Sequence, residues 1–306
     1  LHDALPIYSV ESLTSEDHNT AGMADSILGS ANRTKNANGT VMVGAGNVVT
    51  NSINDFDASG IKTKDGISDP NALSEAMRTA IKGQNGGGAA AVVGNGNIVD
   101  NATNVSILGS KNSLKNTKKA QLLGDNRVVN SADNSVIVGS ADSELTTSNK
   151  NVTVLGYNAN ASVDGGVALG SGSIASTDKG AIGFDLKGED HSTDTTGVWK
   201  STAAAVSVGN KEKNLTRQIT GVAAGTEDTD AVNVAQLKRV SNDAKTKYYS
   251  VNETYNGKVP VIDGFEAYTN ADNKGAKEFA GLAAGYMTYA GGIASTVTGS
   301  FSGIMN

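Results

Sequence analysis

A short aliphatic run closed by glycine recurs along residues 26–209 at a nearly constant interval, as in SILG at 106–109. The commonest step between closing glycines is 15 residues, with later steps of 17, 14 and 13, a gap of 50 after Gly44 and a gap of 26 after Gly183. A fixed interval of this kind indicates a solenoid, in which each repeat forms one coil and stacks on the previous coil. The closing glycines are Gly29, Gly44, Gly94, Gly109, Gly124, Gly139, Gly156, Gly170, Gly183 and Gly209.

Each repeat has a second apolar position about five residues after its glycine. Asn, Ser, Asp and Gly fill the intervals, and these residues favour tight turns, some of which require positive φ. Two short strands and two turns in 14–15 residues describe one coil of a parallel β-roll. Aromatic residues make up only 5% of the chain, which predicts a thin aliphatic core. The second apolar positions are Val49, Val99, Leu114, Val129, Ala161 and Ala175.

Charge and residue spacing argue against several functional classes. The formal net charge of −6 argues against a nucleic-acid partner, because such binding needs clustered Lys and Arg. The chain has no cysteine, and His2, His18 and His191 are far apart without HExxH spacing. No GxSxG elbow or phosphate-binding loop accompanies them. We therefore expect no catalytic residues, no cofactor and no metal ligands.

The repeat ends after Gly209, and RQITGVAAGTEDTDAVNVAQL at 217–237 has a different character. The pattern predicts a helix from Thr229, because Thr229 or Asp230 can cap it and an acidic residue favours that end of a helix. A narrow apolar stripe follows at spacings of 3, 3 and 4, which is typical of a coiled coil. Its members are Val234, Leu237, Val240 and Ala244.

The segment 217–237 resembles, almost residue for residue, the neck motif of the trimeric autotransporter adhesins, the YadA-like surface proteins. GVWKSTAAAVSVGN at 197–210 is similar to the last coil of their head domains, and the glycine repeats resemble their head repeats. The resemblance implies a mainly β fold with a left-handed parallel β-roll head, a neck and a short coiled-coil helix. It also implies that three copies form a homotrimeric fibre.

In that family the neck exchanges chains between neighbours and narrows the head to the stalk. The resemblance implies trimer contacts for the matching positions of this chain. These are the polar Arg217, Asp228 and Asp230, the apolar Ile219, Val222, Ala223 and Val232, the turn residue Gly225, and Asn233, Gln236 and Leu237 at the start of the stalk helix.

We expect four parts along the chain. Residues 1–210 form the head, with a helix-bearing insertion at about 50–89; residues 211–232 form the neck. Residues 233–247 form a short coiled-coil stalk, and residues 248–306 a connector and the start of a second head. KYYSVN at 247–252 resembles the family's connector, and 279–299 resembles first head coils.

The expected insertion contains SDPNALSEAMRTAIKG at 68–83, a near-complete helix signature. Ser68 or Asp69 can cap the helix, Pro70 fits its first turn and Gly83 closes its end. The predicted apolar face is Leu73, Met77, Ala80 and Ile81.

A short acidic stretch in the same insertion is similar to half of a calcium loop. Its residues are Asp55, Asp57, Ser59 and Gly60. Gly66 stands where such a loop needs a bidentate Glu, so no calcium site is predicted.

The resemblance implies a non-enzymatic adhesin segment exposed at the outer membrane of a Gram-negative-type bacterium. Its expected partners are two further copies of itself and host extracellular matrix, glycans or other bacterial cells. Contact with the membrane is expected only through a C-terminal anchor absent from this chain. A second hypothesis is a phage tail fibre or spike that binds or cleaves glycans.

Overall fold

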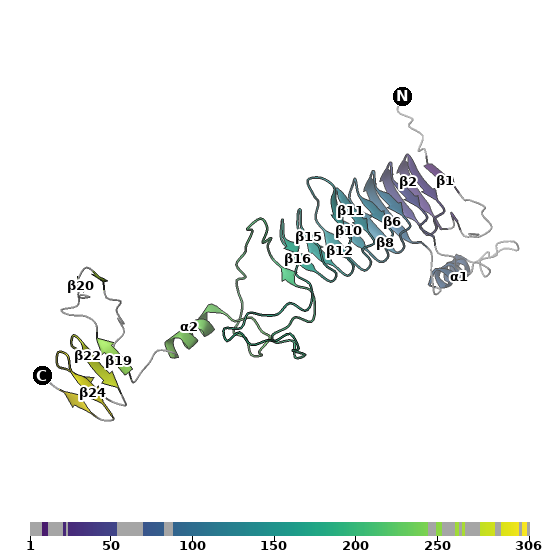
Figure 1. Ribbon diagram of the computed structural model, residues 1–306. Coiled ribbons are helices and arrows are strands. Elements are labelled where there is room, and N and C mark those ends of the chain that lie inside the picture. Colours follow the sequence, from purple (N-terminus) through teal and green to yellow (C-terminus); the bar gives the residue numbers. More distant parts are fainter. Residues whose placement is uncertain are drawn as a thin grey trace. The chain divides into compact units, whose positions relative to one another are not determined.

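The computed structural model describes residues 8–11, 21–22, 24–53, 70–82, 88–243, 249–252, 261–262, 265–266, 276–284, 289–299 and 302–304 (Figure 1). The chain divides into two units, residues 1–219 and 220–306, each considered by itself. No helix among these described residues is both long and apolar enough to cross a membrane.

The first unit is built around two parallel sheets, and it confirms the predicted β-roll (Figure 1). Successive strands of one sheet are joined through a strand of the other, so each coil contributes to both. The larger sheet comprises β2 (Ser26–Ser30), β4 (Val41–Ala45), β6 (Ala90–Asn95), β8 (Val105–Leu108), β10 (Gln121–Leu123), β12 (Val136–Val138), β14 (Thr153–Leu155), β16 (Val167–Leu169) and β18 (Val206–Ser207).

The opposite side of the roll is a seven-stranded sheet followed by a two-stranded one. The seven strands are β1 (Tyr8–Glu11), β3 (Asn32–Lys35), β5 (Val48–Thr50), β7 (Ile98–Asp100), β9 (Ser113–Lys115), β11 (Arg127–Asn130) and β13 (Leu145–Thr147). The short pair is β15 (Asn160–Ala161) and β17 (Ile174–Ala175).

Side chains pointing between the sheets form one continuous aliphatic core. The residue two positions before the closing glycine supplies one side of it, as Ile107 does in β8 and Ile137 in β12. The predicted second apolar positions supply the other side. All six, Val49, Val99, Leu114, Val129, Ala161 and Ala175, are buried.

The closing glycine is required by geometry at each coil. Gly94 has φ of +136°, and a Cβ added there would lie 1.8 Å from the carbonyl oxygen of Gly109 in the next coil. Gly109 has φ of +149° and would place its Cβ 1.9 Å from the oxygen of Gly124. Side chains cannot occupy such a position, so the repeated glycine allows adjacent coils to approach.

The structure corrects one repeat. Gly183 was predicted to close a coil, but β16 pairs directly with β18, with Val167 opposite Val206. Residues 176–205 leave the roll as an excursion, in which Ile182 forms an isolated antiparallel bridge with Lys200. The aliphatic–glycine pattern is therefore not sufficient to define a coil.

The predicted helix in the insertion is confirmed as α1 (Pro70–Lys82). The roll continues across the insertion without a break, because Val41 of β4 pairs with Ala91 of β6. Ser68, Asp69 and Gly83, and the calcium-like stretch at 55–66, lie outside the described residues. The side chains of the predicted apolar face are likewise not described.

The second unit contains α2 (Val234–Asp243) and a small sheet system. Its strands are β19 (Tyr249–Asn252), β20 (Val261–Ile262), β21 (Phe265–Glu266), β22 (Gly281–Ala284), β23 (Tyr289–Ala290), β24 (Thr296–Thr298) and β25 (Gly303–Ile304). Parallel pairing places Leu282 opposite Thr296 and Tyr289 opposite Gly303, a step of 14 residues in each case. The pairing in this unit therefore repeats with a 14-residue step.

Candidate functional site

A column of aliphatic side chains lies on the outer face of the large sheet. The register places its members directly opposite one another on eight successive strands, β2 to β16. Leu28 is 69% exposed, Leu108 54% and Leu155 52%. We call this set the outer aliphatic column. Its members are Leu28, Val43, Val93, Leu108, Leu123, Val138, Leu155 and Leu169.

The middle of this column borders a shallow depression with a volume of about 320 Å³. Val93, Leu108, Leu123 and Val138 contribute to its lining, together with neighbouring side chains such as Gln121. An exposed apolar strip of this length is unusual for a soluble monomer and marks a contact surface.

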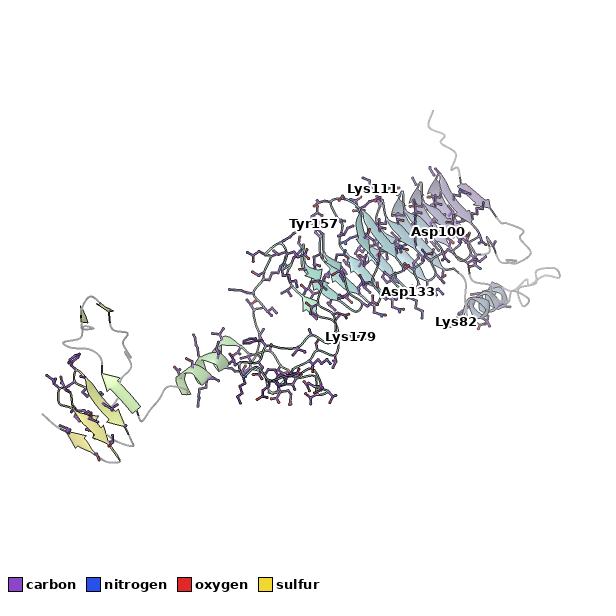
Figure 2. The ribbon with its side chains drawn as sticks, in the orientation of Figure 1. Lys82, Asp100, Lys111, Asp133, Tyr157 and Lys179 are labelled. Carbon is purple, nitrogen blue, oxygen red and sulfur yellow. The ribbon has the colours of Figure 1, made fainter. Side chains whose placement is uncertain are left out.

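The outer face of the seven-stranded sheet differs in character. One of its two outward columns is polar throughout, and Asp100, labelled in Figure 2, belongs to it. The column is Glu11, Lys35, Thr50, Asp100, Lys115 and Asn130. The continuous aliphatic column is therefore specific to the large sheet.

Arg217 closes the last coil of the roll. Its guanidinium donates from Nη1 to the Oγ of Ser173 at 3.0 Å and to the carbonyl oxygen of Val208, and from Nη2 to the oxygen of Ser171 at 2.7 Å. It also occupies the space beside Gly170, where a Cβ would lie 3.0 Å from its Cζ.

Asn233 and Gln236 form a reciprocal cap at the start of α2. The amide of Gln236 donates to Asn233 Oδ1 at 3.0 Å, and the amide of Asn233 donates to Gln236 Oε1 at 3.2 Å. Both side chains also reach back into the neck, because Asn233 Nδ2 donates to the oxygen of Val222 and Gln236 bonds the amide and carbonyl of Gly225. This pair anchors the neck segment to the helix.

The helix begins later than the sequence predicted. Thr229 and Asp230 precede α2 and are not its cap. Asp230 Oδ2 instead accepts hydrogen bonds from the amides of Thr226 and Glu227 at 2.9 and 3.1 Å. These two bonds, in that order, lower the pKa of Asp230 from its ordinary value. A turn closed by the Asp230 carboxylate therefore stands where the sequence predicts the first turn of the helix.

The apolar residues of the neck and helix are exposed in the single chain. Ile219 and Val232 are each 70% exposed, and Leu237 63%. Val222 is half-buried, while Ala223 and Asp228 are exposed. Gly225 is needed for close packing, since a Cβ there would lie 2.7 Å from the Cβ of Asp230. Ala244, the last residue of the predicted stripe, lies outside the described residues.

Comparison with known proteins gives one family match and several relatives. A family model described as the coiled stalk of trimeric autotransporter adhesin matches residues 218–257. Autotransporter adhesin BadA of Bartonella henselae is 62% identical over 72 residues, which is 24% of this chain and 2% of that protein. Trimeric autotransporter adhesin AtaA of Acinetobacter sp. strain Tol 5 is 41% identical over 92 residues, or 29% of this chain and 2% of that protein.

Over these segments the chain is similar to the trimeric autotransporter adhesins. It covers only about 2% of the length of these two relatives, so it corresponds to a small part of such a protein. The resemblance seen in the sequence is confirmed. So is the expected location, the passenger region exposed at the surface of a Gram-negative-type outer membrane.

The excursion at 176–205 carries a group of titratable side chains close together. His191 Nε2 lies 3.0 Å from Asp185 Oδ2, and the His191 ring stacks on Trp199 with centroids 4.4 Å apart. A backbone bond from Lys187 and then the contact with His191 lower the pKa of Asp185. Lys179, labelled in Figure 2, lies near the start of the excursion.

Sequence reasoning missed this group because it treated His191 as isolated. The stretch D-x3-E-x-H at 185–191 was the available signal. The structure places Glu189 beside Asp185 and His191, and possible ligand atoms of all three lie within 4.8 Å of one another. His2 and His18 lie outside the described residues.

Proposed function

We propose that this segment forms a homotrimeric surface fibre that mediates attachment to host matrix, glycans or other bacterial cells. The outer aliphatic column carries the proposal. In one chain it exposes leucine and valine along eight strands, and two identical copies would supply matching apolar surfaces. Each such side chain contributes about 1.5–3 kcal/mol when fully buried, so the repeated contact stabilises a long fibre.

The neck residues extend this contact. In the proposed trimer Ile219, Val232 and Leu237, which are exposed in one chain, pack against the other two chains. The polar positions Arg217, Asp228 and Asp230 complete the contact between chains at its edge. In this proposal residues 1–210 form the head and residues 211–232 the neck. Residues 233–247 form the stalk, and residues 248–306 form the connector and the start of a second head.

Adhesion would result from multivalency and not from catalysis. Three chains present each binding surface three times, and linked sites of this kind can exceed single-site affinity by about 10²–10⁴. Two segments depart from the regular roll, the insertion at about 50–89 and the excursion at 176–205. Such departures from a rigid scaffold are where ligand specificity is usually carried. No feature of the structure favours the phage alternative.

The association state tests the structural half of the proposal. Analytical ultracentrifugation of the 306-residue chain at nanomolar to micromolar concentration is expected to give the mass of three chains. A compact, stable monomer across that range would overturn the proposal.

Binding tests the functional half. The trimer is expected to retain collagen, fibronectin, mucin or intact bacterial cells in a pulldown. The matched control is the same chain without residues 53–87, which shortens the step from Gly44 to Gly94 from 50 to 15 residues and so keeps the spacing of a regular coil. Equal retention by both forms would place binding on the roll, whereas loss would place it on the insertion. Failure of the trimer to retain any of the four classes would count against adhesion.

A further inference from the structure

The excursion at 176–205 brings one nitrogen and two carboxylate groups to one point. Asp185, Glu189 and His191 each offer a ligand atom, and these atoms all lie within 4.8 Å of one another. The side chains of His191 and Asp185 are only 16% and 13% exposed, while Glu189 is exposed. Two of the three donors are thus largely buried in the loop, and the third is exposed.

The two inner donors are oriented by the rest of the excursion. Asp185 Oδ1 accepts the amide of Lys187 at 2.9 Å, which leaves Oδ2 directed toward His191. The imidazole lies almost parallel to Trp199, with an interplanar angle of 6°. Trp199 is fixed in turn because its amide donates to Asp194 Oδ2 at 2.8 Å. Neighbouring groups therefore support the donor geometry.

Two further carboxylates of the excursion already accept hydrogen bonds. Asp190 is occupied by the amide and hydroxyl of Ser192, and Asp194 by Thr196 and Trp199. Lys200 donates its Nζ to the carbonyl oxygen of Ser192 at 2.6 Å. Residues 185–191 contain three carboxylates and one lysine, so their formal charge is −2 with His191 neutral.

We propose that Asp185, Glu189 and His191 bind one divalent transition-metal ion, of which Zn²⁺ is the best match. A neutral imidazole with two carboxylates suits Zn²⁺ and related ions, whose bonds to nitrogen and oxygen are about 2.0–2.2 Å. The imidazole makes Ca²⁺ and Mg²⁺ poor candidates, since both prefer oxygen ligands. Three protein donors leave a further coordination position for water or for a group from outside the chain.

A bound ion would join Asp185 to His191 across the excursion and restrain the loop. This property is independent of the proposed adhesion and of the trimer, because all three donors come from one chain. It concerns the one large departure from the roll that the structure describes in full.

Trp199 provides a direct probe, because it is the single tryptophan of the chain and stacks on His191. Titration of the chelator-treated 306-residue protein with Co²⁺ should quench Trp199 fluorescence saturably, at one ion per chain. Zn²⁺ should compete and restore the fluorescence. Isothermal titration with Zn²⁺ should give the same stoichiometry.

Matched substitutions decide whether the three residues form the site. His191→Gln, Asp185→Asn and Glu189→Gln should each weaken Zn²⁺ binding by about 10-fold or more. Asp178→Asn and Glu212→Gln change exposed carboxylates outside the cluster and should bind like the parent chain. Glu189 is exposed, so its variant is expected to fold normally. Non-saturable quenching, or unchanged affinity in any of the first three variants, would overturn the proposal.

Discussion

The Nε of Arg127 donates a 2.7 Å hydrogen bond to the carbonyl oxygen of Gly139, the closing glycine of the next coil. Asparagine performs this task in four other coils. Asn97 Nδ2, for example, donates to the oxygen of Gly109, and Asn112 Nδ2 to that of Gly124. These amides also bond one another along the roll, which satisfies a buried polar column inside an aliphatic core.

Arg127 ends that amide column and extends its contacts to later coils. Nη2 donates to the oxygen of Gly156 and Nη1 to that of Ala159, so one buried side chain serves three carbonyl groups. Burial lowers the pKa of the Arg127 guanidinium from its ordinary value. Ionised donors form strong hydrogen bonds, which offsets part of the cost of burying the charge.

Arg127→Met should lower the free energy of unfolding by roughly 3 kcal/mol, because it leaves buried carbonyl groups without donors. Arg127→Asn should lose about 1 kcal/mol less, since an amide can still reach Gly139 as Asn112 reaches Gly124. Urea unfolding at fixed chain concentration measures both. Equal stability of the two variants would contradict the role given to the Gly139 contact.

Two glycines in one turn should differ sharply in their tolerance of alanine. Gly96 has φ of +63° and nothing within 4 Å of an added Cβ, so Gly96→Ala should cost about 1–2 kcal/mol from backbone strain alone. Gly94→Ala should cost more than about 4 kcal/mol, because its Cβ would overlap the next coil. Thermal unfolding by circular dichroism compares the pair. Similar melting temperatures would refute the steric explanation of the repeat.

Charge on the outer aliphatic column should separate the chains without unfolding them. Leu108→Asp with Leu123→Asp alters side chains that are 54% and 46% exposed in one chain, so the coil itself should lose little stability. In a trimer the same carboxylates would be buried without partners. Sedimentation should show monomers. Ile98→Asp, at a 45% exposed position of the other sheet, should leave the mass unchanged.

Much of the roll could be predicted because its closing position accepts only glycine, and glycine therefore recurs once in each coil. Gly109 must be glycine wherever the next coil lies against it, so the spacing of such residues reveals the coil. Gly183 has the same local sequence without that contact; its nearest backbone neighbour is the oxygen of Trp199, 3.4 Å from an added Cβ. Local pattern alone could not distinguish the two.

The cluster in the excursion and the start of α2 depended on tertiary contacts. His191 meets Trp199 only because the loop folds back, with Ile182 bridged to Lys200. Thr229 and Asp230 have good helix-capping side chains, but Asp230 is used to close the turn at Thr226. Asn233 and Gln236 carried the better signal, a residue pair at capping-box spacing.

Gln236→Ala should free the neck from the helix. It removes the acceptor used by the amides of Asn233 and Gly225 and the donor to the Gly225 carbonyl. Loss of such a cap costs about 0.5–2 kcal/mol locally. Hydrogen exchange at the Asn233 and Gly225 amides should become faster. Gln236→Glu keeps the acceptor oxygens and should show a smaller increase; equal exchange in both variants would exclude the acceptor role.

The turn closed by Asp230 should open in acid. Its carboxylate accepts from the Thr226 and Glu227 amides, which lowers its pKa in the folded chain. At pH values between the folded and unfolded pKa the unfolded chain binds more protons, so stability rises with pH there. The stabilisation is fully present above the ordinary aspartate pKa and is lost as pH falls through the lower, folded value. The amide chemical shifts of Thr226 and Glu227 should titrate at that lower pH. Asp230→Asn has no carboxylate and should remove this transition; an unchanged titration in the variant would assign it to another group.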